Sequence, residues 1–189
     1  MRVRASVRQS AQQGYSLIEL VVVVAMIAVI TAISVLVMPT ALTAARSAGA
    51  ASQVESALRT AREQALSQRR AIRITFTPPR TVDVVRVELD GALVPLGSTT
   101  LEGGFQFLLF PGQPDTPDGF GRGGAIELNG ATTVQFTSEG TFVDENGDEA
   151  NASVFLGRAQ EPQSAAAVTV FGPTALIRNW RWDGSAWVR

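Results

Sequence analysis

The residue with the clearest chemical signature is Glu19, a lone carboxylate at the head of the apolar run 20–38. A carboxylate in a membrane-spanning segment costs up to ~3 kcal/mol at mid-bilayer and less near the interface, so it usually has a cationic partner. Cleavage between Gly14 and Tyr15 would free an amino group four residues before Glu19, on the same helical face. The spacing therefore predicts charge pairing, with Gly14, Tyr15 and Glu19 as candidate functional residues.

The element that must position Glu19 is a helix long enough to span a bilayer. Residues 20–38 carry no formal charge and would form roughly 28 Å of helix, close to the ~30 Å hydrocarbon core of a membrane. Arg2, Arg4 and Arg8 precede this run, and cytoplasmic flanks carry the excess of positive charge. The N-terminus is therefore expected inside the cell and the remainder of the chain outside.

Two other interpretations of this segment remain open. A secretory signal peptide could be cleaved at the small residues 41–45, although its apolar core is normally shorter and leaves Glu19 without a role. A plain signal anchor explains the length and the basic leader, but it also leaves the carboxylate unexplained.

The residues around Glu19 resemble a known family. A short basic leader, Gly14, Tyr15 and the run Ser16-Leu17-Ile18-Glu19-Leu20 before an apolar helix resemble the processing site of type IV prepilins and type II secretion pseudopilins. The resemblance implies that prepilin peptidase cuts after Gly14 and N-methylates Tyr15, which stands where the family most often has Phe. It also implies that Glu19 neutralises the N-terminus of a neighbouring subunit. The expected partners are prepilin peptidase, other pilins or pseudopilins, and the inner membrane.

Composition limits the chemistry of the chain. The 189 residues include no His and no Cys, so thiolate and imidazole metal sites and the commonest general base are absent. We therefore expect no enzyme, no cofactor and no metal. All 16 basic residues are Arg; without the leader's three, 13 face 17 acidic residues, a net charge of −4. Such a balance predicts no global attraction to nucleic acid.

The apolar pattern predicts four segments: a leader at 1–14, a transmembrane and assembly helix at 15–39, an amphipathic helix at 40–70 and a periplasmic β domain at 71–189. Pro39 predicts a kink or local unwinding within 35–40, after which the helix resumes. The amphipathic helix would bury a stripe of small and apolar residues, namely Val54, Leu58, Ala61 and Ala65. Its other face carries Glu55 and Arg59 at the i, i+4 spacing, which supports a helix with a solvated charged face. The functional alternative is a basic patch formed by Arg62, Arg69, Arg70 and Arg73.

Beyond residue 70 the apolar period changes to two, which predicts antiparallel strands and an α+β, pilin-like fold. The expected strands are 72–76, 81–89, 93–96, 105–110, 125–129, 132–137, 141–143, 153–157, 167–171, 175–182 and 186–188. A change of phase within 81–89 predicts a bulge or a strand buried on both faces. Asp90-Gly91 predicts a hairpin turn, Gly130 the turn of a hairpin between 125–129 and 132–137, and 158–165 a polar loop.

Three further stretches of the β domain are candidate sites. The Pro- and Gly-rich segment 111–124 predicts a long surface loop, either a contact surface or a variable insertion. Segment 144–149 has oxygen ligands at the spacing that begins a calcium loop, but its glycine is misplaced, so a solvated hairpin turn is favoured. Tryptophans at 180, 182 and 187, interleaved with Arg178 and Arg181, would suit either a stacking platform for single-stranded nucleic acid or the core of a C-terminal hairpin.

Stretches 58–65, 134–141 and 171–173 make the chain similar to minor pseudopilins and minor pilins of the GspH/FimT type. Some FimT-like proteins bind DNA through a Gly-Arg-x-Arg motif in the last strand. The aligned stretch here, Ala175-Leu176-Ile177-Arg178, keeps only the final Arg, so Arg178 and Arg181 are weaker candidate DNA contacts. Three functions therefore compete: a minor pilin or pseudopilin, a DNA-binding minor pilin, and a membrane-anchored enzyme with a polar pocket.

Overall fold

The computed structural model describes residues 15–189, apart from the side chains at 35–37, 39 and 40. The predicted leader, residues 1–14, and Gly14 with it lie outside the described residues. The chain divides into two compact units, Met1–Thr40 and Ala41–Arg189.

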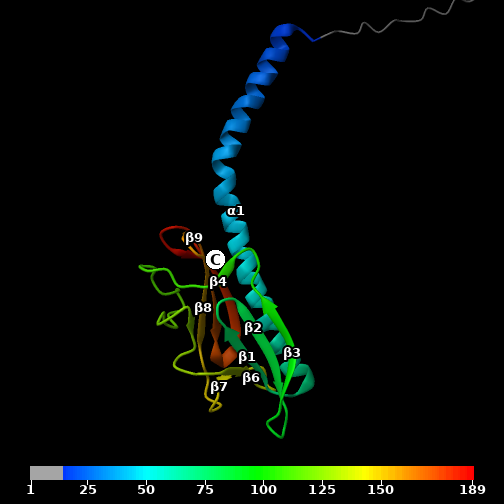
Figure 1. Ribbon diagram of the computed structural model, residues 1–189, viewed down its shortest axis with the longest axis vertical. Helices are drawn as coiled ribbons and strands as arrows, with labels where there is room; N and C mark the ends of the chain where they lie inside the picture. The colour runs from blue at the N-terminus through cyan, green and yellow to red at the C-terminus, as the bar shows by residue number, and fades with distance from the viewer. Residues whose placement is uncertain (1–14) are drawn as a thin grey trace, which may run out of the picture. The chain divides into compact units, whose positions relative to one another are not determined.

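One helix, α1, runs from Leu17 to Gln68 (Figure 1). Its backbone is helical through 35–40, so the helix does not unwind at Pro39, and a kink there, the other expectation, stays a prediction. Proline removes a single helical hydrogen bond, and the helix-forming residues on both sides keep the backbone helical. The helix ends where Arg69 adopts a left-handed φ of 52° and the Arg70 N–H bonds to the Ala65 carbonyl at 3.3 Å.

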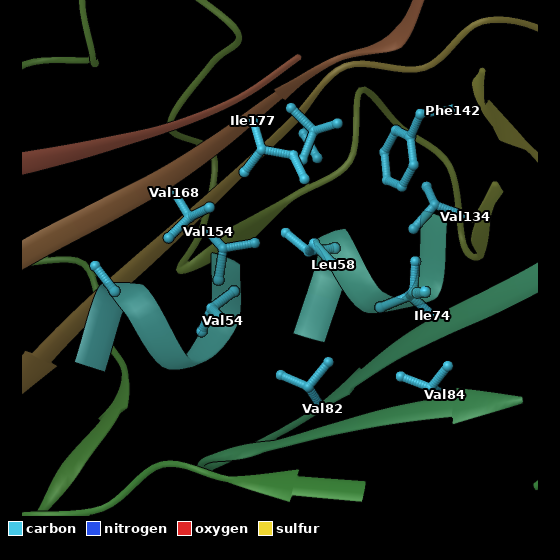
Figure 2. Packing of buried hydrophobic residues seen from close by; sticks show 14 of the residues in the cluster. Val54, Leu58, Ile74, Val82, Val84, Val134, Phe142, Val154, Val168 and Ile177 are labelled. Atoms are coloured by element: carbon cyan, nitrogen blue, oxygen red, sulfur yellow. The ribbon is translucent and has the colours of Figure 1, made fainter. Parts of the chain in front are cut away.

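The second half of α1 supplies one wall of the core, as its apolar stripe predicts. Val54, Leu58, Ala61 and Ala65 are fully buried. Figure 2 shows Val54 and Leu58 between valines of two different β-sheets, with Val154 and Val168 on one side and Val82 on the other. This amphipathic helix therefore packs on an antiparallel β domain, and the predicted fold class is confirmed.

Five strands form the first sheet, in the order β3-β2-β1-β6-β7, with antiparallel neighbours. They are β1 (Ile72–Thr77), β2 (Thr81–Val87), β3 (Leu93–Thr100), β6 (Val134–Phe136) and β7 (Phe142–Asp144). The β2–β3 register shifts between Val84 and Val85, which confirms the predicted bulge. Strand β3 is longer than the expected 93–96, because its uncharged continuation pairs along β2 as far as Thr81.

The second sheet has the order β11-β10-β9-β8-β4, and β5 also pairs with β8. Its strands are β4 (Phe105–Phe107), β5 (Ile126–Glu127), β8 (Ala152–Arg158), β9 (Glu161–Phe171), β10 (Leu176–Trp182) and β11 (Trp187–Val188). A 3-10 turn, η1 (Gly172–Thr174), joins β9 to β10. A Cβ at Gly172 would lie 2.6 Å from the Ala150 carbonyl oxygen, so this close approach requires glycine.

Two predicted connections are wrong. Segments 125–129 and 132–137 do not form a hairpin, because β5 pairs with β8 of the second sheet while β6 pairs with β1 of the first. Segment 158–165 is not a loop: β9 begins at Glu161, where an Arg158–Glu161 salt bridge of 2.9 Å closes a tight turn. Polar residues at the start of β9 concealed the strand, since its buried run begins only at Ser164.

Candidate functional site

The first turn of α1 begins with a hydrogen-bonded cap. Ser16 lies just outside the helix, and its hydroxyl accepts the Glu19 backbone N–H at 3.2 Å. Its carbonyl accepts the Leu20 N–H at 3.2 Å. Ser16 is therefore the N-cap, and Glu19 occupies the third helical position. The Ser-x-x-Glu spacing is the sequence signal of such a cap, and the interpretation based on charge pairing alone missed it.

The carboxylate of Glu19 is left free by this arrangement. Within residues 15–189 it makes no ion pair and no hydrogen bond, and the residue is exposed. Its place in the first turn is favourable, because the N-terminal end of a helix carries partial positive charge. Tyr15, whose amino group would pair with it after cleavage, is 85% exposed.

The helix beyond Glu19 presents an apolar surface. An 18-residue segment, Leu17–Ser34, is long and apolar enough to cross a membrane, and no part of it is buried within the described chain. The Thr31 hydroxyl donates to the Ile27 carbonyl at 2.8 Å, and the Ser34 hydroxyl to the Ile30 carbonyl at 2.9 Å. Because these two hydroxyl groups are satisfied by the helix itself, the part of the segment beyond Glu19 suits a surrounding without water.

The second candidate site, on β10, is engaged inside the fold. Arg178 donates through Nη1 to Asp118, whose side chain is only 6% exposed. The same carboxylate accepts the Thr169 hydroxyl at 2.5 Å and the Trp180 indole N–H at 3.1 Å. The charge of Arg178 is thus compensated by a buried acid, and this pairing weighs against a DNA contact through Arg178.

Arg181, the other candidate DNA contact, lies near the turn after β10. The backbone N–H groups of Ala186 and Ser185 hold the pKa of Asp183 below its usual value, and the Arg181 charge contributes less to the same lowering. A nearby acid therefore offsets part of the Arg181 charge. Contact with DNA through Arg181 stays a prediction.

The tryptophans belong to the core. Trp180 and Trp187 are buried in a cluster with Phe155, and Trp182 packs against that cluster. Trp187 lies 5.3 Å from Trp182 between ring centroids, and its indole N–H donates to the Pro114 carbonyl at 2.9 Å. The core interpretation is confirmed, and a stacking platform for nucleic acid is not formed.

Loop 111–124 is held in place by its own side chains. The Asp115 carboxylate accepts the Gly121 N–H at 2.8 Å, and Phe120 stacks on Phe171 with centroids 6.0 Å apart. Asp118 ties the same loop to β9 and β10. The loop therefore packs against the second sheet, and sequence reasoning missed Asp118 as its anchor.

Segment 144–149, which resembles the start of a calcium loop in sequence, forms a hairpin turn. The Asp144 carboxylate accepts the backbone N–H groups of Asn146 and Asp148 at 2.8 and 2.9 Å. Desolvation acts to raise the pKa of Asp144, but these hydrogen bonds outweigh it and lower the pKa. Across the residues that the structure describes, no cluster of three potential metal ligands is present.

Two arginines of the predicted basic patch, Arg62 and Arg70, make contacts within the domain. Arg62 donates to the Gly140 carbonyl at 3.1 Å and to the Thr174 carbonyl at 3.0 Å. It thereby joins α1 to turns of both sheets. Arg70 instead lies 3.8 Å from Glu88. Of the four arginines only Arg62 lies on α1, and since Arg62 and Arg70 both have partners within the domain, the patch does not present four free cations.

The enzyme alternative would be supported by a polar pocket that holds acidic side chains with shifted pKa values. A groove of about 480 Å³ lies between α1 and β3, lined by small polar residues such as Ser52, Ser56 and Thr60 on the helix and Ser98 on the strand. No charged side chain of the described chain lines it. The acids with lowered pKa values lie in turns elsewhere: Glu139, Asp144, Glu145 and Asp183.

Comparison with known proteins addresses the N-terminal site. Residues 9–35 match the family described as the prokaryotic N-terminal methylation motif. No curated protein matches the chain. The fold is similar to that of the minor pseudopilin EpsH of the Vibrio cholerae type 2 secretion system, at 13% identity and a TM-score of 0.47, over 72% of this chain and 97% of that one. It is also similar to the type IV minor pilin FimU of Pseudomonas aeruginosa, at 17% identity and a TM-score of 0.45, over 69% and 84% of the two chains.

The matched motif and the first turn of α1 coincide. The match covers Tyr15, the Ser16 cap and Glu19, and it continues to the end of the exposed apolar segment. The chain thus carries a prokaryotic N-terminal methylation motif at the head of a helix that continues into an antiparallel β domain.

Proposed function

We propose that this protein is a minor pilin or pseudopilin, a structural subunit of a type IV pilus or a type II secretion pseudopilus. The observation that carries the proposal is the methylation motif at 9–35, placed at the head of a helix whose apolar surface is exposed. A soluble domain would bury such a surface, whereas a fibre subunit needs it for packing against equivalent helices.

In this proposal the helix serves twice. It first holds the precursor in the inner membrane as a single span, with the leader arginines in the cytoplasm and the β domain in the periplasm. Prepilin peptidase then cuts between Gly14 and Tyr15 and methylates the new amino group. When the subunit leaves the membrane, its apolar residues need another dry environment, which helices of neighbouring subunits supply. Glu19 pairs there with the Tyr15 amino group of a neighbour.

The test is the N-terminus of the mature protein, determined by sequencing and intact mass, from cells with and without prepilin peptidase. We expect the mature chain to begin at a methylated Tyr15 only when the peptidase is present. Gly14→Val should keep the leader, whereas the matched leader variant Arg8→Ala should still be processed. A chain that keeps its first fourteen residues beside active peptidase, or that begins near Ala45, would overturn the proposal.

A further inference from the structure

We propose that Asn129 is a site of spontaneous deamidation, a covalent modification that adds a negative charge to the β domain. The chain has four asparagines: Asn129, Asn146, Asn151 and Asn179. Only the first two precede glycine, whose lack of a Cβ lets its backbone nitrogen approach the asparagine side chain most easily. Asn151 is held by the Gly172 N–H at 2.9 Å, and Asn179 precedes a tryptophan.

Asn129 lies in an exposed turn that leaves the reacting groups unrestrained. The Ala131 N–H closes the turn on the Leu128 carbonyl at 3.1 Å. Asn129 and Gly130 have φ values of 56° and 82°, which are typical of the two central residues of a type I′ turn. Within the described chain, neither the Asn129 side chain nor the Gly130 N–H makes a hydrogen bond.

Asn146 is also exposed, but Asp144 accepts hydrogen bonds from both Asn146 and Gly147. Its side-chain amide donates to the Asp144 carboxylate at 3.2 Å, and its backbone N–H donates to the same group at 2.8 Å. The Gly147 N–H, which would supply the nucleophile, bonds to the Asp144 carbonyl at 3.3 Å. Reaction at Asn146 therefore requires bonds of the reacting groups themselves to break, whereas at Asn129 neither reacting group is bonded.

The step needs only water. The Gly130 backbone nitrogen gives up its proton and attacks Cγ of Asn129, so that an N–Cγ bond forms. The bond from Cγ to Nδ2 breaks, and the amide nitrogen leaves as ammonia with the proton. Water then opens the five-membered imide to aspartate or isoaspartate. The product places a carboxylate in the connection from β5 of the second sheet to β6 of the first.

The test is peptide mapping by mass spectrometry of the full-length protein, kept folded in detergent micelles at mildly alkaline pH. We expect the Asn129 peptide to convert to aspartate and isoaspartate at least about tenfold faster than the Asn146 peptide, because the latter must release a hydrogen bond to a carboxylate. Equal rates at the two sites, or no conversion at Asn129, would overturn the proposal.

Three controls test the structural explanation and the assignment to Asn129. In denaturant the two rates should converge, and a difference that persists there would refute the structural explanation. Asp144→Ala should raise the rate at Asn146 toward that at Asn129, with Asp148→Ala as the matched neighbour that leaves it unchanged. Asn129→Gln should abolish the isoaspartate product at this turn; product that remains would assign the reaction to another residue.

Discussion

Glu19 and Asp118 are both single carboxylates, but they differ in burial and in hydrogen bonding. Asp118 is buried and accepts hydrogen bonds from Arg178, Trp180 and Thr169. Glu19 is exposed on an apolar helix; its backbone N–H bonds to the Ser16 hydroxyl, but within residues 15–189 its carboxylate has no partner.

The difference is that the fold satisfies the Asp118 carboxylate and leaves the Glu19 carboxylate unsatisfied. Burial of a charge is tolerated only when charged and polar partners compensate it, so the network around Asp118 explains why that residue is present. No such network in the described chain explains Glu19. Under the proposed function, the partner of this carboxylate would lie in another subunit.

The largest expected effect is that of Asp118→Ala on stability. The change leaves the Arg178 charge without its buried partner and removes the acceptor for Trp180 and Thr169. We expect the free energy of unfolding of the β domain to fall by about 3 kcal/mol, as measured by chemical denaturation of the protein in micelles. The matched control Asp148→Ala, at an exposed turn, should change it by less than about 0.5 kcal/mol. Equal effects of the two variants would contradict a structural role for Asp118.

Glu19→Ala should leave the stability of the β domain unchanged and lower incorporation into fibres. We expect unchanged unfolding of the β domain and unchanged membrane insertion, but about tenfold weaker incorporation into fibres, equivalent to ~1.4 kcal/mol of lost charge pairing. Incorporation is measured as the ratio of fibre-bound to membrane-bound subunit. Glu63→Ala, an exposed acid later on the same helix, is the matched control. Normal incorporation of Glu19→Ala would remove the distinction between the two carboxylates.

The sequence predicted features that depend on neighbouring residues. The buried stripe of Val54, Leu58 and Ala61 follows from helical period alone, and the bulge at Val84 follows from a change of phase within one strand. The sequence also shows Glu19 directly ahead of the apolar run, and its Ser16-x-x-Glu19 spacing indicates an N-cap.

Features that depend on distant partners could not be predicted in the same way. Strands β5 and β6 are two and three residues long, so their own sequences do not specify which sheet each one joins. Asp118 is 51 residues from Thr169 and 60 from Arg178, in a Gly-rich loop without periodicity. Only the fold brings these groups together and pairs Arg178 with a buried acid; a DNA contact through Arg178 stays a prediction.

A smaller effect is expected from Ser16→Ala, which tests whether Glu19 acts through its own helix. Loss of the cap should cost about 1 kcal/mol at the first turn and reduce hydrogen-exchange protection of the Glu19 amide about fivefold. Ser16→Thr should restore the protection. If Ser16→Ala reduced fibre incorporation as much as Glu19→Ala, the carboxylate would act mainly by capping, and the case for a partner in another subunit would fail.

The smallest effect concerns Glu145, a third carboxylate, which is exposed like Glu19 but satisfied like Asp118. Its own backbone N–H and that of Thr133, followed by the N–H and hydroxyl of Thr132, lower the pKa of Glu145 below 4.5. A lowered pKa stabilises the fold at pH values above 4.5, and this contribution is lost as the pH falls through the folded-state pKa. Unfolding measured at pH 7 and pH 3 should therefore show a slightly smaller loss of stability on acidification in Glu145→Gln than in the unmodified chain. If both proteins lost the same free energy of unfolding on acidification, the hydrogen bonds to the Glu145 carboxylate would contribute nothing to stability. These bonds would then not distinguish Glu145 from Glu19.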